Sequence, residues 1–174
     1  MTPRTAGDGF GLFVLENPLP GSGMGLAPED SWTLLSKADL GASQFAVSGA
    51  DVASYDWKNQ TLTLTVEATR RLASAFPGPF LSEVLDYQCF VVTLYGQTLY
   101  GGIILGQGSA MDIEFPSIFV SVVSIGSESE RQVVFSIRPT NTNREFASFP
   151  ESVRSQFQIP EVHDYFAGLG KLSG

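Results

Sequence analysis

The sequence predicts a mainly β protein of the α+β class, built as an antiparallel sandwich or partly closed barrel with one principal covering helix. Three observations predict this. The most apolar run, Cys89–Leu105, alternates with a period of two around a glycine turn. β-branched segments with the same period recur at 118–125 and 131–138. Only Val66–Phe76 places its apolar residues at helical spacing over a longer stretch.

Length and composition indicate one well-packed unit. The chain has 174 residues, of which 43% are hydrophobic and only 16% are charged, and 13 are phenylalanine. A chain of this size and apolar content buries a large core, whereas disordered chains are polar and highly charged. We therefore expect a single domain over residues 1–174.

The charge balance and the cysteine count exclude several function classes. With 10 Lys and Arg against 18 Asp and Glu the formal net charge is −8, which repels phosphate backbones and anionic lipids. We expect no nucleic-acid partner and no membrane association. One cysteine, Cys89, rules out an internal disulfide framework or a multi-cysteine metal site and fits a reducing cytosol. The sequence thus predicts a soluble cytoplasmic protein, and Met1 is followed by no apolar secretion signal.

The N-terminal residues 1–28 form a Gly/Pro-rich arm with one short strand, Phe10–Glu16. We expect this arm to cover a sheet edge, in this subunit or in a neighbour. The segment Pro28–Ser31 has the chemistry of a helix start or a turn. The residues from Trp32 onward fit a strand or a short helix equally well.

The next segment predicts a hairpin followed by the principal helix. Val52–Trp57 and Thr61–Thr65 alternate on either side of a polar turn, which indicates two paired, half-exposed strands. The period then becomes helical from Val66 to Phe76, with Thr65 as the expected N-cap. The Pro-Gly-Pro sequence at 77–79 ends the helix. A short helical turn is expected at 80–85.

The central hairpin is predicted to turn at Gly96-Gln97 with type II′ geometry, which places Phe90 opposite Ile103. Its two expected faces are an apolar one (Phe90, Val92, Leu94, Leu99, Ile103, Leu105) and a mixed one (Cys89, Val91, Thr93, Tyr95, Thr98, Tyr100, Ile104). The mixed face suits a helix, a ligand or another subunit. The mid-strand pair Gly101-Gly102 indicates a β-bulge, a closely packed helix or the approach of a ligand.

Downstream, the sequence predicts a short amphipathic strand at 111–115, a β-branched strand at 118–125 and a returning strand at 131–138, with an acidic loop at 126–130 between the last two. Residues 145–174 are expected to form a tail of loops and short helices, including helical turns at 150–157 and 162–166.

No set of residues predicts catalysis, a metal site or a cofactor. His163 is the only histidine, and its neighbour Asp164 is expected to point away from it, so we interpret it as a surface residue. Cys89 lies in an apolar strand and is expected to be buried and inert. The glycine-rich segments match neither a P-loop nor a dinucleotide-binding motif. The acidic pair Asp112 and Glu114 is expected to be the solvated side of a strand.

Two functional hypotheses remain. The first is a non-catalytic protein-interaction or accessory module that self-associates as a homo-oligomer or binds a protein partner. Its expected interface lies on the central hairpin at Thr93, Tyr95, Thr98 and Tyr100. The alternative is a small-ligand-binding β-barrel or minor enzyme. It requires Tyr100, Asp112 and Arg138 to converge in a pocket.

Overall fold

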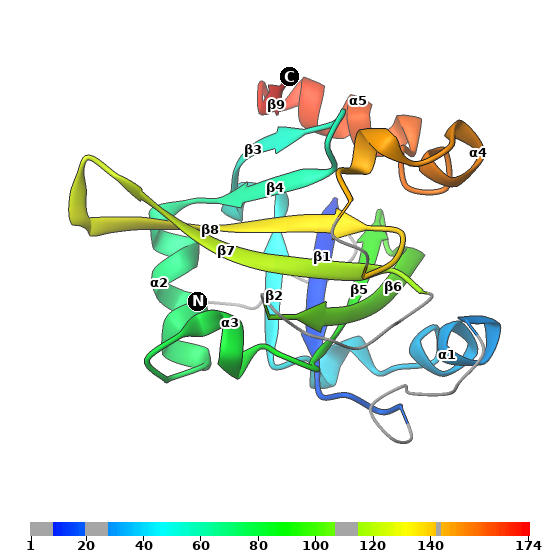
Figure 1. The fold of residues 1–174 in the computed structure, drawn as a ribbon, viewed down its shortest axis with the longest axis horizontal. Helices are drawn as coiled ribbons and strands as arrows, with labels where there is room; N and C mark the ends of the chain where they lie inside the picture. Colours follow the sequence, from blue (N-terminus) through cyan, green and yellow to red (C-terminus); the bar gives the residue numbers. More distant parts are fainter. Residues whose placement is uncertain (1–8, 20–27, 107–114, 142–143) are drawn as a thin grey trace.

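In the computed structural model, which describes residues 9–19, 28–106, 115–141 and 144–174, the strands form one continuous mixed sheet (Figure 1). Its strand order is β2-β1-β5-β6-β7-β8-β4-β3-β9. The strands are β1 Phe10–Leu15, β2 Phe45–Ser48, β3 Val52–Asp56, β4 Thr61–Leu64, β5 Cys89–Leu94, β6 Gln97–Leu105, β7 Ser117–Ile125, β8 Ser127–Arg138 and β9 Leu172–Ser173.

The mainly β, α+β architecture with one principal covering helix is confirmed. Within the described ranges the sheet stays open, with β2 and β9 as its end strands, and the β6–β7 and β3–β9 pairs are parallel where an antiparallel sheet was expected. The α-helices are α1 Pro28–Leu35, α2 Val66–Ala75, α3 Leu81–Val84, α4 Glu151–Arg154 and α5 Pro160–Gly168.

The two faces of the sheet bury separate cores, as alternation along β5 shows. Phe90 and Val92 belong to the main core, which gathers apolar side chains from β1 to β8, α2 and α5. Cys89 and Val91 belong to a smaller core on the opposite face. There Trp32 of α1 packs from outside the sheet, so the segment that fitted strand or helix equally well is a helix.

The N-terminal strand is confirmed, and it lies inside the sheet. All six residues of β1 are buried, and the strand lies between β2 and β5, antiparallel to both. Most of the expected arm, residues 1–8 and 20–27, lies outside the described residues.

The central hairpin is confirmed, whereas its predicted turn and register are wrong. The turn residues are Tyr95 and Gly96, with φ of 49° and 77°, the positive φ pair of a type I′ turn. Cys89, not Phe90, lies opposite Ile103. A one-residue shift turns a strand over, so Ile103 lies in the smaller core and Ile104 joins Phe90 in the main core.

Close packing explains the two glycines in the middle of β6. A Cβ on Gly102 would lie 1.8 Å from the carbonyl oxygen of Pro116, and one on Gly101 would lie 2.6 Å from the carbonyl oxygen of Phe90. The ring of Trp32 also approaches the Gly101 position, at 3.3 Å. The bulge is elsewhere in the strand, between the Val92–Tyr100 and Thr93–Thr98 pairs.

The principal helix and the preceding hairpin are confirmed. The Thr65 hydroxyl caps α2 by accepting a hydrogen bond of 3.1 Å from the Ala68 amide, and β3 pairs with β4 as expected. The short helical turns expected after α2 and in the tail correspond to α3, α4 and α5.

The β7–β8 hairpin differs from the prediction at its turn. The expected acidic loop at 126–130 is strand from Ser127 onward, because Gly126, at φ 68°, reverses the chain within a single residue. The hairpin therefore projects beyond the rest of the sheet, at the left of Figure 1. The strand expected at 111–115 lies outside the described residues over 111–114.

A candidate binding groove beside the β7–β8 hairpin

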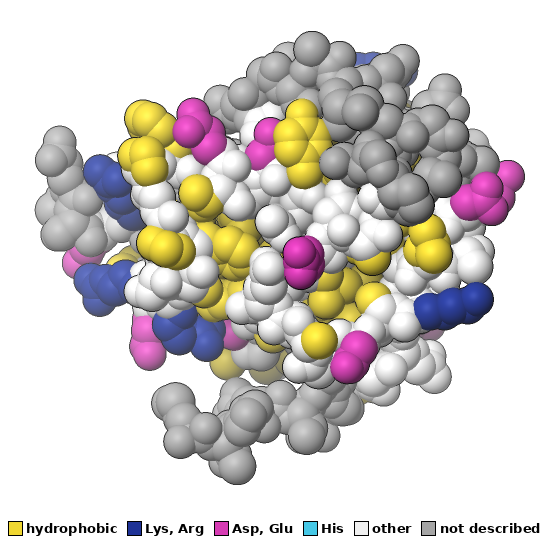
Figure 2. Space-filling model, turned by 90° about the horizontal axis from the view of Figure 1, so that it is seen from below, with side chains coloured by type: hydrophobic (Ala, Val, Ile, Leu, Met, Phe, Trp, Pro, Cys, Tyr) yellow, Lys and Arg dark blue, Asp and Glu magenta, His cyan; other side chains and the backbone are white. Residues whose placement is uncertain are grey.

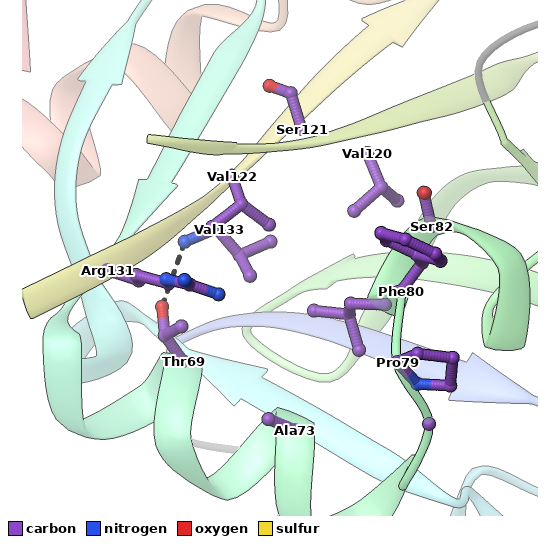
Figure 3. A pocket seen from close by; sticks show the side chains of 12 residues that line it. Thr69, Ala73, Pro79, Phe80, Ser82, Val120, Ser121, Val122, Arg131 and Val133 are labelled. Carbon is purple, nitrogen blue, oxygen red and sulfur yellow. Dashed lines mark hydrogen bonds between the residues drawn. The ribbon is translucent and has the colours of Figure 1, made fainter. Parts of the chain in front are cut away.

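An open groove lies between α2, the segment that joins α2 to α3, and the face of the β7–β8 hairpin (Figure 3). Its volume is about 430 Å³. The groove is lined by Thr69 and Ala73 of α2, by Gly78, Pro79, Phe80, Leu81 and Ser82, and by Val120, Ser121, Val122, Arg131 and Val133 of the hairpin.

A buried hydrogen bond fixes the two walls relative to each other. The amide of Val133 donates to the hydroxyl of Thr69 over 2.9 Å, and this bond is drawn in Figure 3. Both residues are buried, and a bond between buried groups is costly to leave unmade. The helix α2 is therefore tied to β8, and the floor of the groove is preformed.

The remaining wall follows from the end of α2. The prolines at 77 and 79 prevent the helix from continuing, and the chain turns toward α3. A Cβ on Gly78 would lie 2.6 Å from a methyl carbon of Val84, so this turn packs closely on α3. Phe80, which follows directly, is left at the rim.

The groove leaves large apolar side chains in water. Phe80 is 62% exposed and Val122 is 46% exposed, and both line the groove. Figure 2, the view from below, shows hydrophobic side chains beside Lys and Arg side chains at the left, where α2 and the hairpin lie in Figure 1. Clustered exposure of this kind marks an interaction surface, whereas a single exposed apolar residue does not.

Arg131 is the only charged side chain among the described residues that line the groove. It is exposed, and in the described part of the chain no carboxylate or carbonyl accepts from it. Arg71 behaves differently: its guanidinium pairs with Asp51 at 2.6 Å and lies over the ring of Phe45.

The four residues of the expected hairpin interface do not share one surface. Tyr95 is 61% exposed at the turn and its ring contacts Tyr165, and Thr98 is also exposed. Thr93 is fully buried. Tyr100 is half-buried, and its ring packs against Phe90 and Phe157.

The residues expected to form a ligand site are not gathered in the groove. Arg138 is turned to the backbone, where it donates to the carbonyl oxygen of Ile137 at 3.1 Å, and burial lowers its pKa. Burial raises the pKa of Tyr100. Neither residue lines the groove, and Asp112 lies outside the described residues.

His163 differs from the expectation in one respect. Its Nδ1 lies 3.1 Å from the Oδ1 of Asp164, although the two were expected to point apart, and its ring meets the edge of Trp57. Asp164 is exposed and His163 is partly exposed at the surface of α5. Cys89 is fully buried, and burial raises the pKa of its thiol to about 12.

Sequence reasoning missed the groove, because its walls come from segments about 40 residues apart in the chain. Two signals were present: Phe80 follows Pro-Gly-Pro outside any apolar stripe, and the strand at 117–125 carries no charge. Neither signal places the segments side by side.

Within the described ranges, no three His, Cys, Asp or Glu side chains come together as metal ligands, and no helix is long and apolar enough to cross a membrane. Comparisons with protein-family models, with curated proteins and with solved structures found no match.

Proposed function

We propose that this protein is a non-catalytic protein-interaction module that binds its partner, either another protein or a second copy of itself, through the groove and the adjoining hairpin. The observation that carries the proposal is the exposure of Phe80 and Val122 in a groove whose walls, α2 and β8, are joined by the buried hydrogen bond between Thr69 and Val133. Apolar surface left in water is stabilised when a partner covers it, by about 25 cal/mol per Å² buried. Binding to a preformed surface also avoids the entropy cost of ordering it.

The chemistry of the lining supports recognition over catalysis. Arg131 is the one charged group among the described residues that line the groove, and that lining includes no histidine, cysteine or carboxylate to act as a general acid or base. The aromatic ring of Phe80, the valines and the arginine of this lining suit an interface centre, where aromatic residues and arginine are enriched. Val123 and Ile125 are exposed on the same hairpin, but alternation along the strand turns them to the face opposite Val122, so they are not part of the groove.

Selection from a displayed library of random 12-residue peptides on the full chain tests the proposal. Ala73→Arg fills the groove with a long side chain and is the blocking variant. Ser74→Arg, one residue along the same helix, makes the same charge change outside the lining and is the matched control; both positions are exposed. We expect peptides that bind the wild type and the control but not the blocked variant.

Equal binding of the selected peptides to both variants, or no enrichment by a wild type that sediments as a monomer, would contradict the proposal. Sedimentation velocity on the same three proteins tests self-association. If a second copy fills the groove, the wild type and the Ser74→Arg control sediment as dimers and the Ala73→Arg variant as a monomer.

The volume of the groove favours a second candidate. About 430 Å³ lies within the size range of small-molecule sites, so the protein is alternatively a small-ligand-binding protein. A thermal-shift screen against a metabolite set measures this, because a ligand that binds only the folded state raises the midpoint of unfolding. A shift produced by one compound class and abolished by Ala73→Arg would favour this candidate.

A further inference from the structure

We infer that the groove recognises a protein segment in which a bulky apolar side chain is accompanied by a carboxylate, and that Arg131 binds this carboxylate. The inference rests on the proposed function and adds the chemistry of the partner. It follows from the charge, the hydrogen bonds and the exposure of the residues that line the groove.

The first argument is that Arg131 differs from most of the arginines that the structure describes. Arg71 pairs with Asp51, and three others donate to backbone carbonyl oxygens, namely Arg138, Arg144 and Arg154. Only Arg70 and Arg131 have no such acceptor among the described residues, and of these two only Arg131 lines the groove. A guanidinium presents a planar fork of donors that matches a carboxylate.

The second argument is the position of this charge. On the hairpin Arg131 lies two residues from Val133, the residue tied to α2, and opposite Ser124. Figure 3 shows its side chain above α2, on the same side of the groove as Val122 and Val133. An apolar side chain that fills the space between Phe80 and Val122 would therefore bring its neighbouring residues close to the guanidinium.

The third argument concerns specificity. The chain carries a net charge of −8, so most of its surface repels an acidic segment. Binding is favoured only where a positive group stands beside apolar surface. Opposite charges at the rim of an apolar contact direct a partner to one register on the surface, and long-range steering weakens as salt is added.

A double-mutant cycle tests the inference. The tightest peptide from the library selection is synthesised, and each of its Asp or Glu residues is replaced in turn by Asn or Gln. Dissociation constants are measured by fluorescence polarisation against the full-length wild type, Arg131→Gln and Arg70→Gln. Arg70 is the matched control because it is exposed, lacks a partner among the described residues and lies outside the lining.

We expect one carboxylate whose replacement weakens binding to the wild type by up to about fivefold, the upper end of the range for an exposed ion pair. The same replacement should have no effect on binding to Arg131→Gln and its full effect on binding to Arg70→Gln. Arg131→Glu should reverse the preference, so that a Lys-substituted peptide binds this variant better than the acidic one does. Thermal unfolding of each variant checks that its fold is intact.

The inference is overturned if the tightest peptide has no carboxylate, or if Arg131→Gln and Arg70→Gln weaken binding equally. Binding that is lost in Ala73→Arg but unchanged in Arg131→Gln would leave the proposed function standing and reject the carboxylate. Absence of any selected peptide for a wild type that is monomeric would reject both. A wild-type dimer that Arg131→Gln dissociates would show that the occupant is a second copy.

Discussion

Replacing Gly102 by alanine tests the packing that joins β6 to β7. The added Cβ would lie 1.8 Å from the carbonyl oxygen of Pro116 and 3.0 Å from a ring carbon of Phe90. A carbon and a carbonyl oxygen need about 3.3 Å or more, so the chain at Pro116 must move by roughly 1.5 Å. That carbonyl oxygen accepts a 3.0 Å hydrogen bond from Ile103, which the movement would break.

The cost has two parts. Overpacking a core costs about 1–3 kcal/mol, and leaving a buried amide without its partner costs about 1–3 kcal/mol. We therefore expect Gly102→Ala to lower the free energy of unfolding by about 2–6 kcal/mol, a large fraction of the roughly 5–15 kcal/mol typical of a domain. The midpoint of thermal unfolding should fall by about 10 °C.

Urea unfolding followed by tryptophan fluorescence measures this change, since Trp32 packs directly beside this strand. Gly168→Ala is the matched control: a Cβ there meets no atom within 4 Å, and alanine favours the helix, so stability should stay equal or rise by up to about 1 kcal/mol. The close approach of Gly102 to the Pro116 carbonyl oxygen would be refuted if the free energy of unfolding of Gly102→Ala lay within about 1 kcal/mol of the wild-type value. That interval is close to the error of a typical fit.

Three further outcomes are expected. Thr69→Val should lower stability by about 1–3 kcal/mol in urea unfolding because the Val133 amide loses its acceptor, whereas Thr69→Ser should retain most of the stability. Phe80→Ser should change stability by less than about 0.5 kcal/mol, because the ring is largely exposed, yet weaken peptide binding; a large loss of stability would show that the ring supports the fold. Cys89 should resist a thiol reagent at pH 8 until the protein unfolds. The pKa of the Cys89 thiol is about 12 in the folded protein and near 9 in the unfolded chain. The stability that the buried neutral thiol contributes is therefore complete below pH 9 and is lost as the pH rises from 9 toward 12. Over this range the free energy of unfolding should fall more steeply in the wild type than in Cys89→Ala.

Local patterns in the sequence were sufficient to predict the elements that are stabilised by contacts between residues close together in the chain. The helix α2 carries its N-cap, its apolar stripe and its Pro-Gly-Pro terminator within one continuous segment. The hairpins β3–β4 and β5–β6 were likewise visible from alternation. In each case the deciding contacts are between residues close in sequence, which is where patterns carry information.

Features that depend on distant contacts were not predictable. Glycine is the usual residue for a positive φ, so the sequence pointed to a turn beginning at Gly96; the chain instead places Tyr95 in that conformation and shifts the register by one residue. The groove likewise requires Thr69, Phe80 and Val122, which come from three separate segments, to line one space. No periodic pattern in the sequence predicts that proximity. The central position of β1 depends on its pairing with β5, about 80 residues away.

Hydrogen exchange of the full-length protein, with and without the selected peptide, tests the binding groove most directly. Slower exchange of backbone amides in 69–82, 120–125 and 131–133 on peptide addition is the expected result. Slower exchange confined to the Tyr95 turn and the rest of the β5–β6 hairpin, with the groove segments unchanged, would contradict the binding groove. The interface would then lie on the central hairpin, as the sequence predicted.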